Sequence, residues 1–216
     1  MREISDIYSH YHIPPVIQTH QLRVAAVART IAAAHAGDCD AEVVTQVGLL
    51  HDMGNIIKVE FDTFPKVWEP EGVEHWKGVR DAMIAQYGKD EHTATVAIAK
   101  EIGVSDMVLH CTDMMSFSHI EKVLLEGTRE EQICAYADNR VGPFGVLSLA
   151  ERLEEARKRY MHRTDRIFSN ERHSEIVRRA HELEDVLFAG ISLQPADITD
   201  AHIAPIIEKL SCYTFA

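Results

Sequence analysis

The sequence has few cysteines, no long apolar run and fewer basic than acidic residues, and each shortage excludes a class of protein. The four cysteines are scattered without a C-x-x-C pair, so we expect reduced thiols rather than a disulfide framework or a zinc knuckle. The longest apolar stretch, Val24 to Ala36, is interrupted by Arg29 and Thr30 and is too short to span a bilayer. The start of the chain is charged and lacks the apolar segment of a signal peptide. These features predict a soluble cytoplasmic protein with no membrane partner.

The charge balance is acidic, with 22 Lys and Arg against 34 Asp and Glu and a formal net charge of −12. An acidic surface repels phosphate backbones, so nucleic acid is not expected as the main partner. A small anionic substrate stays compatible with this charge, because a bound cation or a few Arg and Lys can reverse the field locally. The 13 histidines are the unusual feature, since histidine is the commonest metal ligand and carries protons near pH 7.

Helical periodicity dominates the sequence, and no alternating strand pattern, repeat or low-complexity segment is evident. Asp40, Asp90 and Thr128 are positioned as N-caps, and Thr128 with Glu131 fits a capping box. The fold class is therefore predicted as all-α. The expected helices cover about residues 15–36, 41–53, 72–87, 91–102, 104–115, 117–126, 128–141, 148–161, 170–189 and 199–211.

The predicted organisation is one domain over residues 1–165, with an irregular insert at about 58–78, followed by a helical extension over 166–216 packed on the same domain. The insert is aromatic and holds both tryptophans, Trp68 and Trp76, close to Phe61 and Phe64. Such a segment is either a lid with an aromatic face for a nucleobase or a small core beneath a loop, and we favour the small core.

A set of histidines and aspartates carries the candidate chemistry. His51-Asp52 ends a strongly apolar helix, so both side chains lie near the core and need partners. His20 lies on the apolar face of the first long helix, and Asp138 lies four residues after Cys134 in an apolar segment. Two His and two Asp that project inward from three helices can build a mixed nitrogen and oxygen metal site with open positions.

This pattern resembles the H…HD…D signature of the HD-domain superfamily, which comprises metal-dependent phosphohydrolases with an all-α fold. The segment His51-Asp52-Met53-Gly54 looks like the HD-x-G turn of that family, residues 135–141 resemble its closing Y-A-D segment, and residues 146–152 are similar to its V-S-L-x-x-R stretch. The resemblance covers roughly residues 15–160. It implies an HD-domain helical bundle and one divalent metal (Mn, Fe, Co, Ni, Zn or Mg) held by His20, His51, Asp52 and Asp138.

Some members hold a second metal with further histidines, and His92 is similar to the first of these extra ligands. His110 is a candidate for the other, with His119 as an alternative, although one metal is favoured. The resemblance assigns catalytic roles to Asp52, His92 and the residue after HD-x-G, which is Asn55 here instead of the family's frequent Lys or Glu. An amide can hold a water or a phosphate oxygen but cannot take a proton. Asp52 itself, Glu91 or Asp113, or the metal alone, would then have to activate the water.

The substrate is expected to be a small phosphorylated molecule, such as a phosphomonoester or phosphodiester of a nucleotide or similar metabolite. A bound divalent cation lowers the pKa of its water from about 15.7 toward roughly 7 and offsets phosphoryl charge. Candidates to hold the substrate phosphates are Arg140, Lys58, Lys77 and Arg80. The alternatives are a di-iron oxygenase on the same scaffold, or a degenerate HD domain that binds a nucleotide as a sensor. The sequence leaves open whether the chain forms a homodimer.

Overall fold

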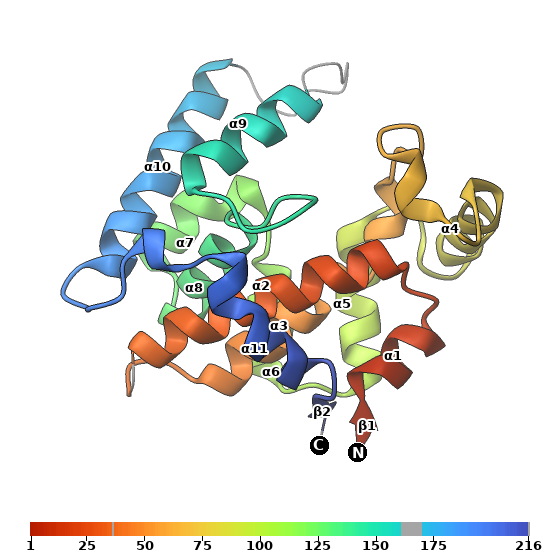
Figure 1. The fold of residues 1–216 in the computed structure, drawn as a ribbon, viewed down its shortest axis with the longest axis horizontal. Coiled ribbons are helices and arrows are strands. Elements are labelled where there is room, and N and C mark those ends of the chain that lie inside the picture. The colour runs from red at the N-terminus through yellow and green to blue at the C-terminus, as the bar shows by residue number, and fades with distance from the viewer. Residues whose placement is uncertain (36, 161–169, 216) are drawn as a thin grey trace.

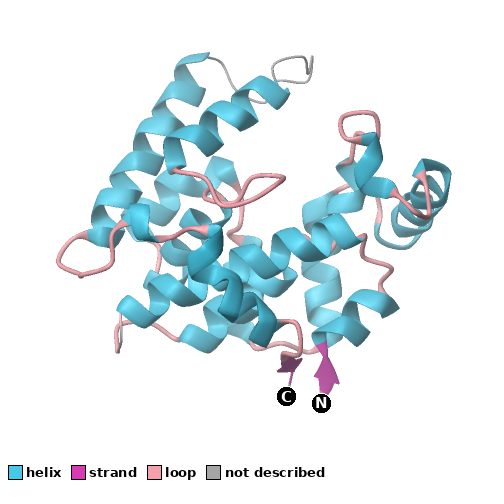
Figure 2. Cartoon of the chain, viewed as in Figure 1, coloured by secondary structure: helices cyan, strands magenta, loops and turns pink. Residues whose placement is uncertain are grey.

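The computed structural model describes residues 1–35, 37–160 and 170–215, and this part of the chain is an array of helices with two very short strands (Figure 1, Figure 2). The α-helices are α1 Ile4–His10, α2 Pro15–Ala34, α3 Ala41–Leu50, α4 Val73–Tyr87, α5 Glu91–Ile102, α6 Asp106–Asp113, α7 Ile120–Glu126, α8 Arg129–Asp138, α9 Leu149–Tyr160, α10 Asn170–Phe188 and α11 Asp200–Leu210. The 3-10 helices are η1 Asn55–Lys58, η2 Pro65–Trp68, η3 Phe117–His119 and η4 Pro195–Asp197, and the strands are β1 Arg2–Glu3 and β2 Thr214–Phe215. The all-α prediction is confirmed.

Helix α2 lies at the centre of the fold because its middle is built from small apolar residues. Each of the five residues from Val24 to Ala28 is 0% exposed, so this part of the helix is enclosed by neighbours. Those neighbours are α3, α8 and α11, which pack along it (Figure 1). Alanine side chains let helices approach closely, so residues on α2 and α3 can meet across a short distance.

All three predicted N-caps are present. The side chains of Asp40, Asp90 and Thr128 each accept a hydrogen bond from a backbone N–H in the first turn of α3, α5 and α8, respectively. At α8, Glu131 completes the predicted capping box. These caps fix where α3 and α8 begin. His51 follows the last residue of α3, and Asp138 is the last residue of α8.

The insert after η1 packs its tryptophans into the hydrophobic core of the chain. Trp68 is 5% and Trp76 is 6% exposed, and their indole N–H groups donate to the carbonyl oxygens of Phe61 and Trp68. Both indole rings are therefore committed to packing. The two tryptophans are core residues, as favoured, but they join the main hydrophobic core instead of a separate small one. The lid interpretation of the insert stays a prediction.

The C-terminal helices return to the main body of the chain. Helix α10 packs on α7 and α8, whereas α11 packs on α2. The strands β1 and β2 pair antiparallel, with Arg2 opposite Phe215 and Glu3 opposite Thr214, so the two ends of the described chain lie side by side (Figure 2). The predicted domain boundary at 165/166 lies outside the described residues and stays a prediction. Among the described helices, none has the length and apolarity that a bilayer span requires.

Candidate metal centre

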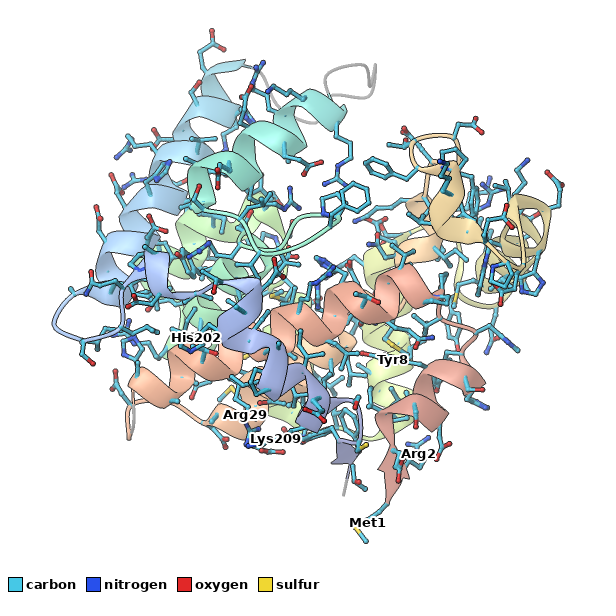
Figure 3. The ribbon with its side chains drawn as sticks, in the orientation of Figure 1. Met1, Arg2, Tyr8, Arg29, His202 and Lys209 are labelled. Carbon is cyan, nitrogen blue, oxygen red and sulfur yellow. The ribbon has the colours of Figure 1, made fainter. Side chains whose placement is uncertain are left out.

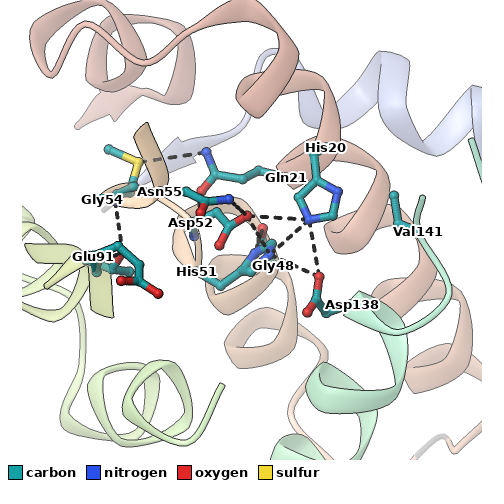
Figure 4. A network of polar contacts seen from close by, with 12 residues as sticks. His20, Gln21, Gly48, His51, Asp52, Gly54, Asn55, Glu91, Asp138 and Val141 are labelled. Atoms are coloured by element: carbon teal, nitrogen blue, oxygen red, sulfur yellow. Dashed lines mark hydrogen bonds and ion pairs between the residues drawn. The ribbon is translucent and has the colours of Figure 1, made fainter. Parts of the chain in front are cut away.

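Four side chains from three helical segments meet in one cluster. The His20 Nε2 atom, from α2, lies 3.2 Å from Asp138 Oδ1, 3.3 Å from His51 Nε2 and 3.6 Å from Asp52 Oδ2 (Figure 4). The His51 Nε2 atom lies 3.5 Å from Asp138 Oδ1 and 3.8 Å from Asp52 Oδ2. The structure thus brings together all four residues that the sequence proposes as metal ligands.

A glycine in α3 makes the meeting of the two histidines feasible. A Cβ atom on Gly48 would lie 2.5 Å from Ala25 Cα, so α2 and α3 touch backbone to backbone at this point. The carbonyl of Gly48 also accepts a hydrogen bond of 2.9 Å from His51 Nδ1. That bond turns the Nε2 atom of His51 toward the cluster, which is the usual way in which proteins orient a ligating imidazole.

The HD-x-G turn is held from two sides. The buried side chain of Gln21 accepts a 3.2 Å hydrogen bond from the backbone N–H of Asp52. On the other side, the N–H of Gly54 donates to Thr95 Oγ1 at 2.8 Å, and a Cβ on Gly54 would lie 2.3 Å from the carbonyl oxygen of Glu91. Only glycine therefore lets the turn pack on α5. Sequence reasoning missed Gly48, Gln21 and Thr95, and the nearest signal was the position of Gln21 beside His20.

Asn55 contacts a member of the cluster directly. Its Nδ2 atom donates to Asp52 Oδ2 at 2.6 Å, and its Oδ1 atom is buried without a hydrogen-bond partner among the described residues. The amide therefore orients the Asp52 carboxylate, which is a role that the sequence did not assign to it. The buried Oδ1 is an acceptor that a bound water or substrate hydroxyl can satisfy.

The charges of the cluster stabilise one another. Burial lowers the pKa of His51, but the charge of Asp52 and the hydrogen bond and charge of Asp138 outweigh this effect and raise the pKa to about 9. Burial likewise raises the pKa of Asp138, and the hydrogen bonds and charges of His20 and His51 overcome it and hold that pKa well below its usual range. Without a metal, the cluster therefore keeps a proton on imidazole between two carboxylates. A cation at this position would take the place of that proton.

The donor set fits a divalent metal. Ligand bonds of about 2.0–2.2 Å place neighbouring donors about 2.8–3.1 Å apart around an octahedral ion and about 3.3–3.6 Å apart around a tetrahedral one. Five of the six distances among the four donors run from 3.2 to 3.8 Å, close to that range. The sixth, between the carboxylates of Asp52 and Asp138, is longer, because only His20, His51 and Asp52 offer ligand atoms that all lie within 4.8 Å of one another. Two imidazole nitrogens with two carboxylates suit the first-row transition metals, and the carboxylates also suit Mg²⁺.

The two histidines proposed for a second metal have separate partners. His92 Nε2 lies 3.1 Å from Asp113 Oδ1, and His110 Nε2 lies 3.2 Å from Glu131 Oε1. Among the described residues, neither histidine belongs to a group of three or more clustered His, Cys, Asp or Glu donors, whereas His20, His51 and Asp52 do. The described residues thus form one cluster of metal donors. Binding of a second metal by His92 and His110 stays a prediction.

The proposed phosphate-binding cations differ in their surroundings. Lys58 ends η1 and lies 3.1 Å from Glu91, beside the HD-x-G turn. Lys77 and Arg80 lie on α4 and pair with Glu74 at 2.7 Å and Asp81 at 3.2 Å. Of these three, only Lys58 belongs to the segment that follows directly from the cluster.

The structure corrects the role predicted for Arg140. It is 3% exposed, and its guanidinium donates to the Tyr136 hydroxyl and to carbonyl oxygens of the chain, those of Leu147, Pro195 and Ile198. A buried guanidinium with its donors committed in this way cannot reach a substrate phosphate. The prediction that Arg140 binds substrate is wrong, and the residue instead ties the end of α8 to the segment before α11.

A family profile described as HD domain matches residues 17–141, more than half of the chain and the part that holds all four cluster residues. The chain belongs to the HD-domain family. This family comprises metal-dependent phosphohydrolases, and HD domains bind divalent metals. Searches of curated proteins and of solved structures found no match to the chain. The HD-domain assignment therefore rests on the profile, the all-α fold and the cluster.

Proposed function

We propose that this HD-domain protein is a metal-dependent hydrolase of a phosphomonoester or phosphodiester, with a nucleotide or a similar small metabolite as substrate. The observation that carries the proposal is the cluster of His20, His51, Asp52 and Asp138, whose donor atoms have the spacing of a metal site. A divalent cation held there supplies a water of lowered pKa and offsets the charge of a phosphoryl group.

The exposure of the cluster supports a catalytic rather than a purely structural metal. The side chains of His20 and Asp52 are each 20% exposed and that of Asp138 is 35% exposed, whereas that of His51 is 3% exposed. One side of the cluster is thus open to solvent, and catalytic metal sites keep such an open position for water and substrate. An all-protein structural site would enclose its ligands instead.

The neighbouring residues have distinct parts in the proposal. Asn55 orients Asp52 through its amide N–H and offers a free acceptor, but it carries no proton. Lys58, next to the turn, is the cation we assign to the substrate phosphate, released from Glu91 when substrate binds. His92, paired with Asp113, is the group we assign to proton transfer, since an imidazole has one nitrogen that can accept a proton and one that can donate it.

The test is elemental analysis of the purified chain, followed by assays on phosphomonoesters, phosphodiesters and nucleotides with Mn, Fe, Co, Ni, Zn and Mg. Asp52→Asn and Asp138→Asn should lose metal and turnover, while Asp185→Asn, an exposed aspartate on α10, should keep both. Full turnover in Asp52→Asn would contradict the proposal. Two irons per chain with oxygen uptake would favour the oxygenase alternative.

A nucleotide sensor is the second candidate. It is favoured by Asn55, which takes the place of a proton-accepting side chain and is bonded to Asp52. A sensor would bind a nucleotide with metal present and release it unchanged. Equilibrium binding of a nucleotide without product over many hours would support the sensor and contradict the hydrolase.

A further inference from the structure

A cleft lies apart from the metal cluster, between α2, α11 and the C-terminal residues. It is open to solvent and has a volume of about 960 Å³, and its polar lining includes Arg29, Glu42, Asp197, His202, Lys209 and Tyr213. Figure 3 labels three of these, Arg29 on α2 with His202 and Lys209 on α11, on the face turned toward the viewer. None of the lining residues belongs to the metal cluster.

Three of the lining side chains carry basic nitrogen, on a chain whose net charge is −12. Arg29 is fixed at the cleft by a 3.1 Å hydrogen bond to Thr45 Oγ1 and an ion pair of 3.6 Å with Glu42. Within the described part of the chain, the side chains of His202 and Lys209 form no ion pair or hydrogen bond. Two basic groups that form no ion pair in a shared cleft are unusual on an acidic surface, and they attract an anion.

The two carboxylates of the lining are already engaged. Glu42 accepts from the hydroxyl of Tyr213 and pairs with Arg29, and Asp197 Oδ2 accepts from the backbone N–H of Gln194 at 2.8 Å. Their hydrogen bonds hold the walls of the cleft in place. They leave the ammonium of Lys209 and the imidazole of His202 as the groups available to a ligand.

Apart from Thr30 and Ser192, the remaining lining is apolar, so the ligand should not be a bare ion. His202, Ile206 and Lys209 lie four and three residues apart on one face of α11, which puts an apolar side chain between two basic ones. The rest of the apolar lining is Ala33, Ala34, Leu193 and Leu210. A volume of about 960 Å³ falls in the range of small-molecule sites.

The wall of this cleft is bonded to the segment that positions a metal ligand. Arg140, two residues after Asp138, donates to the carbonyl oxygens of Pro195 and Ile198 at 3.0 and 3.3 Å, on either side of Asp197. Asp200, at the start of α11, accepts from the backbone N–H of Val146 at 3.2 Å, and Val146 bridges to Val141. A shift of residues 195–202 therefore pulls on both ends of the turn that follows Asp138.

We propose that this cleft binds a small organic anion, a carboxylate or phosphate attached to an apolar group, and that its occupancy is coupled to metal binding through Arg140. The anion draws Lys209 and His202 toward Arg29 and fixes the 195–202 segment, which steadies Asp138 and tightens the hold on the metal. Coupling of this kind is reciprocal, so metal also strengthens anion binding. The proposal does not rest on hydrolysis being the activity of the metal centre.

The probe is phenylphosphonate, an aromatic anion with a carbon–phosphorus bond that a phosphohydrolase cannot cleave, and benzyl alcohol is its uncharged control. Calorimetry on the metal-loaded protein should detect binding of phenylphosphonate but not of benzyl alcohol. Lys209→Glu should weaken binding by about tenfold or more, the effect of losing one charge contact. Lys122→Glu, at an exposed lysine on α7, should leave binding unchanged.

The Asp52→Asn variant separates the two sites. Binding that persists in Asp52→Asn and is lost in Lys209→Glu places the anion in the cleft. Binding lost in Asp52→Asn and kept in Lys209→Glu would put the probe at the metal and overturn the proposal, and so would an absence of binding to the wild-type protein. For the coupling, saturating phenylphosphonate should lower the metal dissociation constant about threefold or more in the wild type and not in Lys209→Glu. An unchanged constant in the wild type would refute it.

Discussion

Gly48 lies against Ala25 with no room for a side chain between them, since a Cβ at position 48 would be 2.5 Å from Ala25 Cα and 2.7 Å from its nitrogen. This contact sets the separation of α2 and α3 one turn from the metal cluster. It is the reason that His20, on one helix, and His51, at the end of the other, bring their Nε2 atoms to 3.3 Å.

Replacing Gly48 should therefore damage the site as well as the fold. Gly48→Val forces α2 and α3 apart, and overpacking of this kind costs about 1–3 kcal/mol of unfolding free energy. We expect lower stability in urea unfolding and a loss of metal by elemental analysis. Gly78→Ala is the matched control, because its Cβ would meet nothing within 4 Å and alanine favours the helix. A Gly48→Val protein with normal metal content would show that the helix separation does not matter.

Removing the amide of Asn55 should weaken metal binding without abolishing it. Asn55→Ala deletes the 2.6 Å hydrogen bond that orients Asp52, and loss of such a partner lowers metal affinity about 10–100-fold. Metal titration of the stripped protein measures the change, and turnover at saturating metal should recover in large part. Normal affinity with no turnover at saturating metal would instead assign Asn55 to the chemical step.

Metal affinity should rise with pH up to about pH 9. The pKa of His51 in the metal-free cluster is about 9, raised from its ordinary 6.5, so below that pH a metal must displace a proton. Displacement of one proton gives an increase in affinity of about tenfold per pH unit. Titrations at three pH values between 6.5 and 8.5 test this, and a flat profile would contradict it.

The same shift has a consequence for the metal-free fold. A histidine whose pKa is higher in the folded than in the unfolded state stabilises the fold fully below the unfolded value of 6.5, and this stabilisation is lost as pH rises through about 9. Thermal unfolding of metal-free protein should therefore occur at lower temperature at pH 9.5 than at pH 7. Added metal should reduce the difference, because it replaces the proton.

We expect Arg140 to stabilise the fold and not to bind substrate. Arg140→Met leaves the carbonyl oxygens of Leu147, Pro195 and Ile198 buried without their donor, and each unsatisfied group costs about 1–3 kcal/mol. We expect a large loss of stability in chemical unfolding, in contrast with Lys58→Met, which should fold normally and raise KM for a phosphorylated substrate. A stable Arg140→Met protein with a raised KM would restore the substrate-binding role.

Much of the fold follows from local sequence. Apolar periodicity together with the caps at Asp40, Asp90 and Thr128 predicts where the long helices lie, because both are short-range properties of the chain. The seven-residue α1 and the two-residue ladder of β1 with β2 were not predicted. Elements this short have little periodicity and exist because distant parts of the chain support them.

The sequence by itself determined the all-α class and the four cluster residues. The residue types and their positions on the helices are enough to identify two histidines and two aspartates that face inward. The tertiary structure alone decided what surrounds them. It buried Arg140 against carbonyls 55 and 58 residues away, bonded Asn55 to Asp52, and pressed Gly48 onto Ala25. Burial and hydrogen-bond partners depend on contacts between remote segments. The local sequence around a basic residue therefore does not tell whether its side chain faces a substrate or the core.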